Sequence, residues 1–242
     1  MGKNKIERFR ENETFALLHQ PDFMSLFNGD FELKSKWHEI FFKNNNPIVL
    51  ELGCGRGEYT VKLAQMFPDK NFIGIDVKGA RLWRGAKTAA EEQMTNVAFV
   101  RTRIEVVTSI FGTEEVSEIW ITFPDPQPNK AKKRLCSTRF LNRYAQFMAE
   151  KGIVHLKTDS QMLHEYTKAI LDRNKITPLE ATNDLYSGGG GNETLSIKTA
   201  YEKLFIGKGY GITYLKFNLP ANANLEEPED FTFDMNVPKA KR

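Results

Sequence analysis

The chain has 242 residues, of which 40% are hydrophobic and 27% are charged, and its formal net charge is +3. This composition is ordinary for a globular protein and excludes a largely disordered chain. No apolar run approaches the roughly 18 residues of a spanning helix, and residues 1–10 are charged, so we expect a cytoplasmic protein without a membrane segment. The two cysteines and four histidines show no metal-ligand spacing, and we expect no metal.

Apolar runs alternate with helical patterns from residue 48 onward, after an amphipathic stretch at Phe31–Phe42. The predicted strands are Ile48–Leu52, Asn71–Asp76, Val97–Arg101, Ile119–Phe123, Ile153–Lys157 and Ile212–Phe217. The predicted helices are Tyr59–Phe67, Arg81–Met94, Thr138–Ala149 and one that begins near Asp159. This alternation is typical of an α/β protein with a parallel sheet.

We expect three segments along the chain. Residues 1–45 form a partly helical N-terminal extension, residues 46–219 form the α/β domain, and the polar residues 220–242 form a flexible tail. Inside the domain, the glycine run at Ser187–Gly191 predicts a mobile loop.

A glycine cluster follows the first predicted strand. Gly53 and Gly55 allow a ligand to approach bare backbone at the carboxyl end of that strand. The sixth position of the dinucleotide fingerprint, normally glycine, is Glu58, which disfavours a pyrophosphate. Glu51, just before the loop, suits a ligand with a cationic amino acid portion. S-adenosylmethionine has an ammonium, a sulfonium and no phosphate.

Asp76 places a carboxylate at the end of the second predicted strand. A carboxylate there can accept hydrogen bonds from both ribose hydroxyls. NAD enzymes use the same contact, so an NAD-binding oxidoreductase is the alternative interpretation. Glu51 and Glu58 favour the methyl donor over NAD.

Three short motifs follow in the same order as in a known family. Phe123–Pro126 reads Phe-Pro-Asp-Pro, Lys157–Asp159 reads Lys-Thr-Asp, and Thr199–Glu202 fits Thr-x-x-Glu. With these motifs the chain resembles the bacterial tRNA (guanine-N7)-methyltransferase family from about Ile48 to Phe217. The resemblance implies a class I methyltransferase fold, which is Rossmann-like and doubly wound, with a mostly parallel sheet and helices on both faces.

The resemblance also implies an activity and a set of site residues. The activity is methyl transfer from S-adenosylmethionine to guanine N7 in tRNA, at the variable-loop guanine (position 46). The implied donor contacts are Glu51, Asp76, Arg103 and Asp125. The implied substrate contacts are Asp159, Thr199 and Glu202.

Asp125 suits the catalytic role for a chemical reason. Guanine N7 has a free lone pair, so no proton must leave before attack, and the methylated ring is cationic. A carboxylate favours that growing charge. Asp159 and Glu202 can accept from the N1 and N2 donors of guanine. Two structural alternatives stay open: Asp159 caps the helix that follows it, and Thr199 with Glu202 forms a capping box.

Three positions depart from the family pattern. Gln127 stands where tryptophan is usual, and Arg103 stands where many members have aspartate, which affects the expected adenine contact. The family's loop lysine falls on Asn129 by direct count and on Lys130 by chemistry.

Basic residues gather behind Asp125. Between residues 126 and 149 the chain has no acidic residue and six basic ones: Lys130, Lys132, Lys133, Arg134, Arg139 and Arg143. We expect tRNA phosphates to contact this segment, with Lys132, Lys133 and Arg134 as the main candidates. A solvated helix face is the alternative. A methyltransferase for another RNA is the second choice of function, and a monomer is the expected assembly.

Overall fold

The computed structural model describes residues 3–187 and 192–233. Residues 188–191 of the predicted mobile loop Ser187–Gly191 and residues 234–242 of the predicted tail lie outside the described residues. The chain divides into two compact units, Met1–Ile119 and Trp120–Arg242.

The first unit contains a parallel sheet with the strand order β1-β4-β3-β2. Three strands match the predicted bounds: β2 (Ile48–Leu52), β3 (Asn71–Asp76) and β4 (Val97–Arg101). A two-residue strand, β1 (Leu18–His19), pairs with β4 and is too short to show a pattern in the sequence. Every residue of β2 is buried, as expected for a parallel strand that helices cover on both faces.

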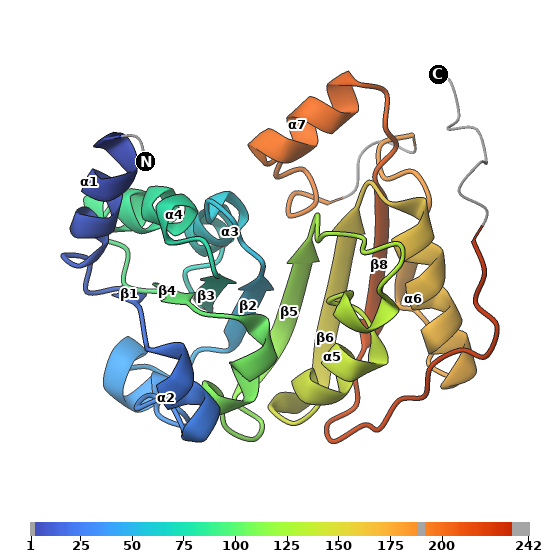
Figure 1. The fold of residues 1–242 in the computed structure, drawn as a ribbon, viewed down its shortest axis with the longest axis horizontal. Coiled ribbons are helices and arrows are strands. Elements are labelled where there is room, and N and C mark those ends of the chain that lie inside the picture. Colours follow the sequence, from blue (N-terminus) through green and yellow to red (C-terminus); the bar gives the residue numbers. More distant parts are fainter. Residues whose placement is uncertain (1–2, 188–191, 234–242) are drawn as a thin grey trace. The chain divides into compact units, whose positions relative to one another are not determined.

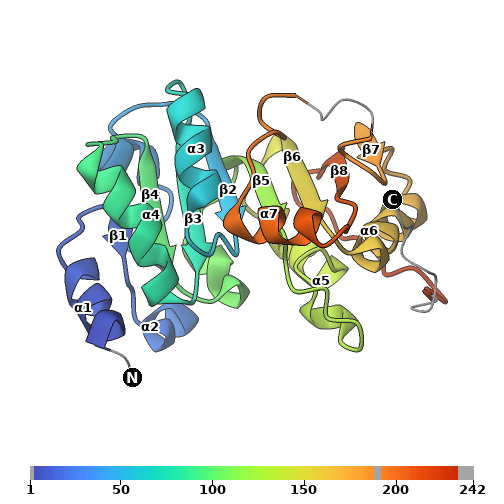
Figure 2. The same cartoon turned by 90° about the horizontal axis from the view of Figure 1, so that it is seen from above.

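Helices lie on both faces of this sheet (Figure 1). The α-helices of the unit are α1 (Lys3–Asn12), α2 (Phe23–Asn28), α3 (Glu58–Met66) and α4 (Gly79–Glu91). Figure 2 shows α3 and α4 side by side over the strands. A short 3-10 helix, Ile104–Ser109, leads from β4 toward β5.

The amphipathic prediction at Phe31–Phe42 is only half right. Residues Trp37–Phe42 form one π-helical segment, and the residues before it form turns. Trp37 is fully buried, and its indole N–H donates to the Ile110 carbonyl at 3.1 Å. Glu115 accepts from the Trp37 backbone N–H, so a tertiary contact rather than helical periodicity shapes this segment.

The second unit contains the end of β5 (Val116–Thr122), a strand that begins in the first unit. It also contains β6 (Met148–Thr158), β7 (Glu180–Thr182) and β8 (Thr213–Asn218). Strand β8 pairs antiparallel with both β6 and β7. The helices are α5 (Thr138–Tyr144), α6 (Gln161–Arg173), α7 (Ala200–Gly207) and the 3-10 turn Ala131–Lys133.

The predicted helix at Thr138–Ala149 is too long. It ends at Tyr144, and β6 begins at Met148, five residues before the predicted strand. Phe147 and Met148 are buried, and a short apolar run of this kind fits a strand as well as a helix. The fourth strand was predicted at Ile119–Phe123. In the structure it begins three residues earlier, at Val116, and ends at Thr122.

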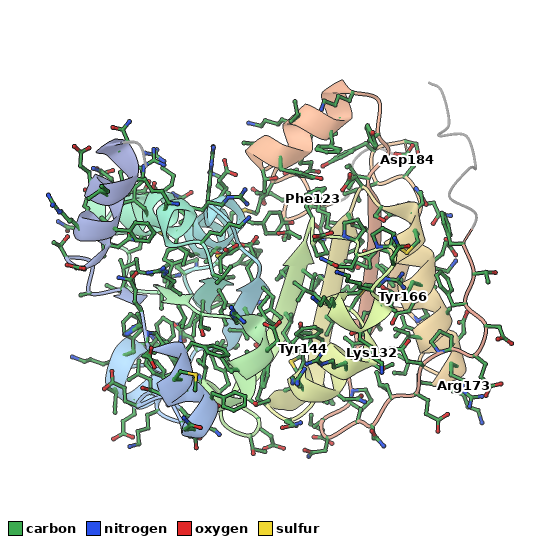
Figure 3. The ribbon with its side chains drawn as sticks, in the orientation of Figure 1. Phe123, Lys132, Tyr144, Tyr166, Arg173 and Asp184 are labelled. Carbon is green, nitrogen blue, oxygen red and sulfur yellow. The ribbon has the colours of Figure 1, made fainter. Side chains whose placement is uncertain are left out.

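Part of the C-terminal segment lies along α5 and α6. The Glu227 carboxylate accepts from the Thr138 hydroxyl and the Tyr166 hydroxyl, each at 2.7 Å, and Leu225 N–H donates to Asn142 at 2.7 Å. Figure 3 labels Tyr166 on α6. These contacts attach Leu225 and Glu227 to the two helices. Both residues belong to the tail 220–242, whose flexibility stays a prediction.

Candidate active site

The glycine loop after β2 has a backbone that only glycine adopts easily. Gly53, Gly55 and Gly57 all have positive φ, at 75°, 58° and 67°. A Cβ at Gly55 would meet no atom within 4 Å, whereas a Cβ at Gly57 would lie 2.6 Å from the Phe99 ring. The loop therefore leaves open space above Gly55 and packs tightly on β4 at Gly57.

Glu51 is buried beneath this loop, with a relative exposure of 3%. Its carboxylate accepts from the backbone N–H and the hydroxyl of Thr60, in the first turn of α3. The N–H groups of a first helical turn have no partner within the helix, so the carboxylate satisfies one of them. This contact holds the carboxylate beside the glycine loop.

Asp76 connects the end of β3 to the same loop. One carboxylate oxygen accepts from Gly55 N–H at 2.9 Å, and the other accepts from Lys78 N–H at 2.7 Å. A carboxylate has about four acceptor positions, so it can also accept from ribose hydroxyls.

The pKa of the Cys54 thiol reflects the negative electrostatic potential at the glycine loop. Burial raises its pKa well above the ordinary value, and the negative charges of Glu51 and Asp76 raise it further. The thiol is therefore protonated and unreactive at neutral pH. The same negative potential favours a cationic ligand and disfavours a phosphate.

Arg103 precedes the 3-10 helix after β4 and is exposed. Its guanidinium lies 5.0 Å from the centre of the Phe23 ring on α2. The side chain thus stacks on an aromatic ring in the first unit.

In the second unit, Asp125 follows β5 in a turn with strained backbone. Phe123 and Gln127 have φ of 48° and 45°, which is uncommon for residues other than glycine and costs of order 1–3 kcal/mol. The backbone N–H of Phe123 donates to the Lys157 carbonyl at 2.8 Å, which anchors the turn to β6. Figure 3 labels Phe123 at the end of β5.

Gln127 fixes the Asp125 carboxylate. One carboxylate oxygen accepts from the Gln127 side-chain amide at 2.7 Å, and the other accepts from the Gln127 backbone N–H at 3.2 Å. Asp125 itself is exposed. The residue that departs from the family pattern therefore orients the predicted catalytic group, a role that its residue type alone did not indicate.

The basic segment behind the turn contains two kinds of side chain. Asn129, Lys130, Lys132 and Lys133 are exposed. Arg134 instead has a relative exposure of 5%, and its guanidinium donates to the Pro128 carbonyl at 2.9 Å. It also lies 4.3 Å from the Tyr166 ring centre, so it ties the loop to α6 in this structure. Its contact with RNA stays a prediction.

The capping alternative for Asp159 is wrong. The N-cap of α6 is Ser160, whose hydroxyl accepts from Leu163 N–H at 3.2 Å. The alternative for Thr199 is confirmed in part, since its hydroxyl accepts from Glu202 N–H at 3.1 Å at the start of α7.

Glu202 pairs with Lys157 in a fully buried cluster. Lys157 Nζ lies 2.9 Å and 3.0 Å from the two carboxylate oxygens and donates to the carbonyls of Leu195 and Ile197. Both side chains have 0% exposure. Tyr186 donates its hydroxyl to Glu202. Burial lowers the pKa of Lys157, while the negative charge of Glu202 opposes this effect.

Tyr201 lies in the first turn of α7. Burial raises the pKa of its hydroxyl, and the charges of Asp159 and Asp125 raise it further. Its ring centre lies 5.4 Å from that of Phe123 and 4.2 Å from that of Phe205, with which it stacks. Asp125, Asp159 and Thr199–Glu202 all belong to the second unit.

Comparison with known proteins places the chain in a family. A family described as "Putative methyltransferase" matches residues 45–215. A tRNA (guanine-N(7)-)-methyltransferase of Bacteroides fragilis is 50% identical over 229 residues, which cover 95% of this chain and 91% of that protein. The enzyme of the same description from Christiangramia forsetii is 54% identical over 221 residues, 90% of this chain and 99% of that protein. The chain belongs to the tRNA (guanine-N(7)-)-methyltransferase family.

A solved structure supports the fold of this family member. The crystal structure of the 16S rRNA methyltransferase KamB aligns with a TM-score of 0.60 at 13% identity, covering 78% of this chain and 95% of that one. The predicted family and the predicted class I methyltransferase fold are confirmed.

Within residues 3–187 and 192–233, no helix is long and apolar enough to cross a membrane. In the same ranges, no group of three His, Cys, Asp or Glu side chains is placed to hold a metal ion.

Sequence reasoning missed the positioning roles of several residues that hold the predicted site residues. Thr60 holds Glu51, Gln127 holds Asp125, and Lys157 with Tyr186 holds Glu202. Their partners are 9, 2, 45 and 16 positions away in the sequence, and only the shortest of these distances is visible in a local pattern.

Proposed function

We propose that this protein transfers a methyl group from S-adenosylmethionine to N7 of a guanine in tRNA, and that this guanine is the variable-loop guanine at position 46. The observation that carries the proposal is identity of about half the residues, over most of both chains, to proteins described as tRNA (guanine-N(7)-)-methyltransferases. We expect the protein in the cytoplasm, where this substrate is found.

The first unit fits the methyl donor chemically. Gly53 and Gly55 expose backbone, the space above Gly55 is open, and Glu51 and Asp76 give the loop a negative potential. Asp76 would accept from the ribose hydroxyls, and Glu51 would face the cationic amino acid portion. Arg103, whose side chain stacks on Phe23, would contact the adenine through its backbone. When bound, S-adenosylmethionine supplies an electrophilic methyl group on a sulfonium.

Residues of the second unit suit the guanine. The N7 lone pair forms the new N–C bond, the C–S bond breaks with its electrons going to sulfur, and the positive charge passes to the purine. Asp125 stabilises that charge, and its fixed orientation on Gln127 lowers the reorganisation that the step requires. We assign Asp125 as the catalytic residue on this basis.

We assign the guanine edge to the neighbouring residues. Asp159 accepts hydrogen bonds from the N1 and N2 donors of guanine. These contacts would select guanine over adenine. Thr199 and Glu202 complete the proposed substrate site, and Glu202, which is fully buried, would act there by holding the start of α7 through its ion pair with Lys157. Asn129 and Lys130 are the candidates for the loop contact, and Lys132, Lys133 and Arg134 are the candidates for phosphate contacts.

The test is methylation of tRNA transcripts with labelled donor. Label should enter a transcript with guanine at position 46 and be released as N7-methylguanine. A transcript with adenine at position 46 should accept none. Label that enters both transcripts equally would contradict the assigned position, and label in neither would contradict the activity.

A further inference from the structure

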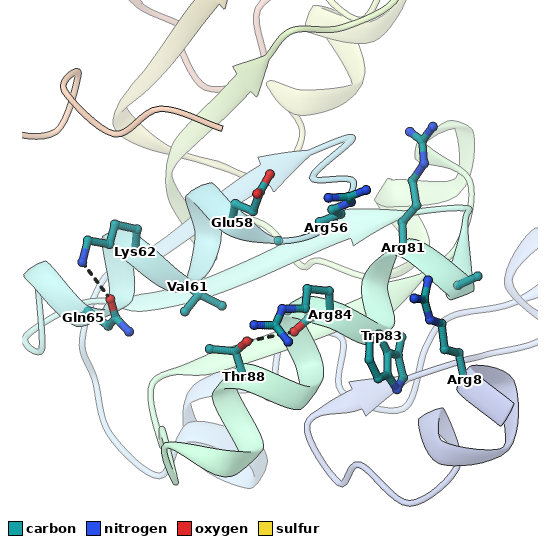
Figure 4. Close-up of a pocket in the computed structure, with 13 residues that line it drawn as sticks. Arg8, Arg56, Glu58, Val61, Lys62, Gln65, Arg81, Trp83, Arg84 and Thr88 are labelled. Carbon is teal, nitrogen blue, oxygen red and sulfur yellow. Dashed lines mark hydrogen bonds between the residues drawn. The ribbon is translucent and has the colours of Figure 1, made fainter. Parts of the chain in front are cut away.

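A basic pocket lies between α3 and α4 in the first unit and reaches the end of the glycine loop. It has a volume of about 510 Å³, and Figure 4 shows the side chains that line it. Its lining begins with Arg56 and Gly57, where the glycine loop ends, and continues along one face of each helix. None of the residues proposed above to hold the donor or the guanine is among them.

The charge of this pocket is strongly positive. Five basic side chains and one acidic side chain line it: Arg8, Arg56, Lys62, Arg81, Arg84 and Glu58. Arg56, Arg81 and Arg84 are exposed, and within residues 3–187 and 192–233 none of these three forms an ion pair with an acidic side chain. Five positive charges beside one negative charge repel one another on balance, and a bound anion relieves that repulsion.

The backbone that carries these basic residues is closely packed. A Cβ at Gly85 would lie 2.8 Å from the Arg56 carbonyl and 3.1 Å from Gly57 Cα, so α4 packs directly on the end of the loop. Arg8 is held as well, because its guanidinium lies 4.6 Å from the Trp83 ring centre. Trp83 in turn donates its indole N–H to Glu11 at 2.6 Å.

The arrangement suits a polyanion better than one small anion. Arg81 and Arg84 are one helical turn apart on the same face of α4, and Arg56 and Lys62 come from two other segments. Guanidinium groups match the oxygens of a phosphate through paired hydrogen bonds. Several such groups spread over a surface can each take a different phosphate of one nucleic-acid strand.

We infer that this α3–α4 pocket binds the ribose-phosphate backbone of the tRNA, as a second contact surface besides the basic segment behind Asp125. The inference rests on the proposed function for the identity of the RNA. It adds a separate surface, on the first unit, that grips the substrate by charge and carries no sequence information itself.

The test is the double variant Arg81→Gln with Arg84→Gln, compared with the control Lys36→Gln with Lys43→Gln. The control removes the same charge from exposed positions of the same unit outside the pocket. Binding of tRNA is measured as a function of salt, and binding of S-adenosylmethionine is measured by calorimetry. We expect the pocket variant to bind tRNA at least about tenfold more weakly at low salt, with the slope of log K against log salt smaller by one to two units. The control should bind tRNA as the wild type does.

The outcomes separate this inference from the proposed function. Weaker tRNA binding with unchanged donor binding in the pocket variant alone supports the pocket as an RNA surface. If the wild type methylates tRNA and the pocket variant binds tRNA as tightly as the wild type, the inference is overturned and the proposed function stands. Binding of polyglutamate, a model of an acidic protein, is measured in parallel. If the pocket variant loses polyglutamate binding but keeps tRNA binding, the pocket binds an acidic protein and the inference is overturned. A wild type that neither binds nor methylates tRNA overturns both.

Discussion

Asp125 combines exposure to solvent with a fixed orientation. Its two carboxylate oxygens accept from one residue, Gln127, through the side chain and the backbone. Exposed polar residues contribute little to stability, so under the proposed function a change at Asp125 should affect the reaction rather than the fold.

Replacing Asp125 with asparagine should lower kcat by about 100-fold or more, because the neutral amide no longer stabilises the purine cation. Single-turnover methylation at saturating tRNA and donor measures this loss. The melting temperature should stay within about 1–2 °C of the wild type, given a small effect on stability. Full activity in this variant would remove Asp125 from the mechanism.

Gln127→Ala is the companion variant for the positioning role. It keeps the carboxylate and removes the amide that holds it. We expect a smaller loss of kcat than in Asp125→Asn, with KM for tRNA unchanged. A kcat equal to that of the wild type would show that the orientation of Asp125 does not depend on Gln127.

The Glu202→Gln variant tests the buried pair. It leaves the Lys157 ammonium buried with only neutral acceptors, and loss of one partner of a buried pair typically costs about 3–5 kcal/mol. Urea unfolding measures the change. Tyr186→Phe, which removes one hydrogen bond to the same carboxylate, is the control and should cost about 1 kcal/mol. Equal losses in the two variants would contradict a dominant role for the ion pair.

At the scale of the element, two glycines of the loop after β2 have similar φ values but different surroundings. Gly55 and Gly57 differ by only 9° in φ, yet one faces open space and the other faces the Phe99 ring. The first position is therefore available to a ligand, and the second is a packing contact.

Gly57→Ala should destabilise the protein more than Gly55→Ala. Both changes place an alanine at positive φ, which costs about 1–2 kcal/mol. Only Gly57→Ala also pushes against Phe99, at 2.6 Å, and we expect a further loss of about 1–3 kcal/mol from that overpacking. Denaturant unfolding compares them. For donor affinity the order should reverse, with the larger loss in Gly55→Ala, and the same order in both measurements would contradict these assignments.

At the scale of the whole molecule, acid should destabilise the fold through buried histidines. Burial lowers the pKa of His164 and of His19, so both are neutral in the folded protein and gain a proton more readily once it unfolds. The stability that each contributes is complete above the unfolded pKa of about 6.5 and is lost as the pH falls through that value.

The free energy of unfolding should therefore decrease below about pH 6.5, by at most about 1.4 kcal/mol per pH unit for each histidine. Urea titrations at several pH values measure the slope. His164→Leu should reduce it, because the leucine takes up no proton in the unfolded chain. An unchanged slope in that variant would show that His164 does not contribute to the acid sensitivity.

The sequence alone determined the strands and helices whose signals are local. The four apolar residues of β2, the Asp76 at the end of β3 and the Phe-Pro-Asp-Pro motif are all local signals, and β2, β3 and β4 match their predicted bounds. The family could be predicted in the same way, because its motifs are contiguous.

How the predicted functional groups are held depends on contacts between segments that lie far apart in the sequence. The helix after Asp125 ends at Tyr144 because Phe147 and Met148 are needed in the core, and Trp37 lies in a π-helical segment because Ile110 and Glu115 bind it. Hydrogen bonds and ion pairs between distant positions leave no periodic trace in a sequence, since each depends on two segments meeting in space. Hydrophobic period and turn chemistry act over a few residues, and so they can be recognised before the chain folds.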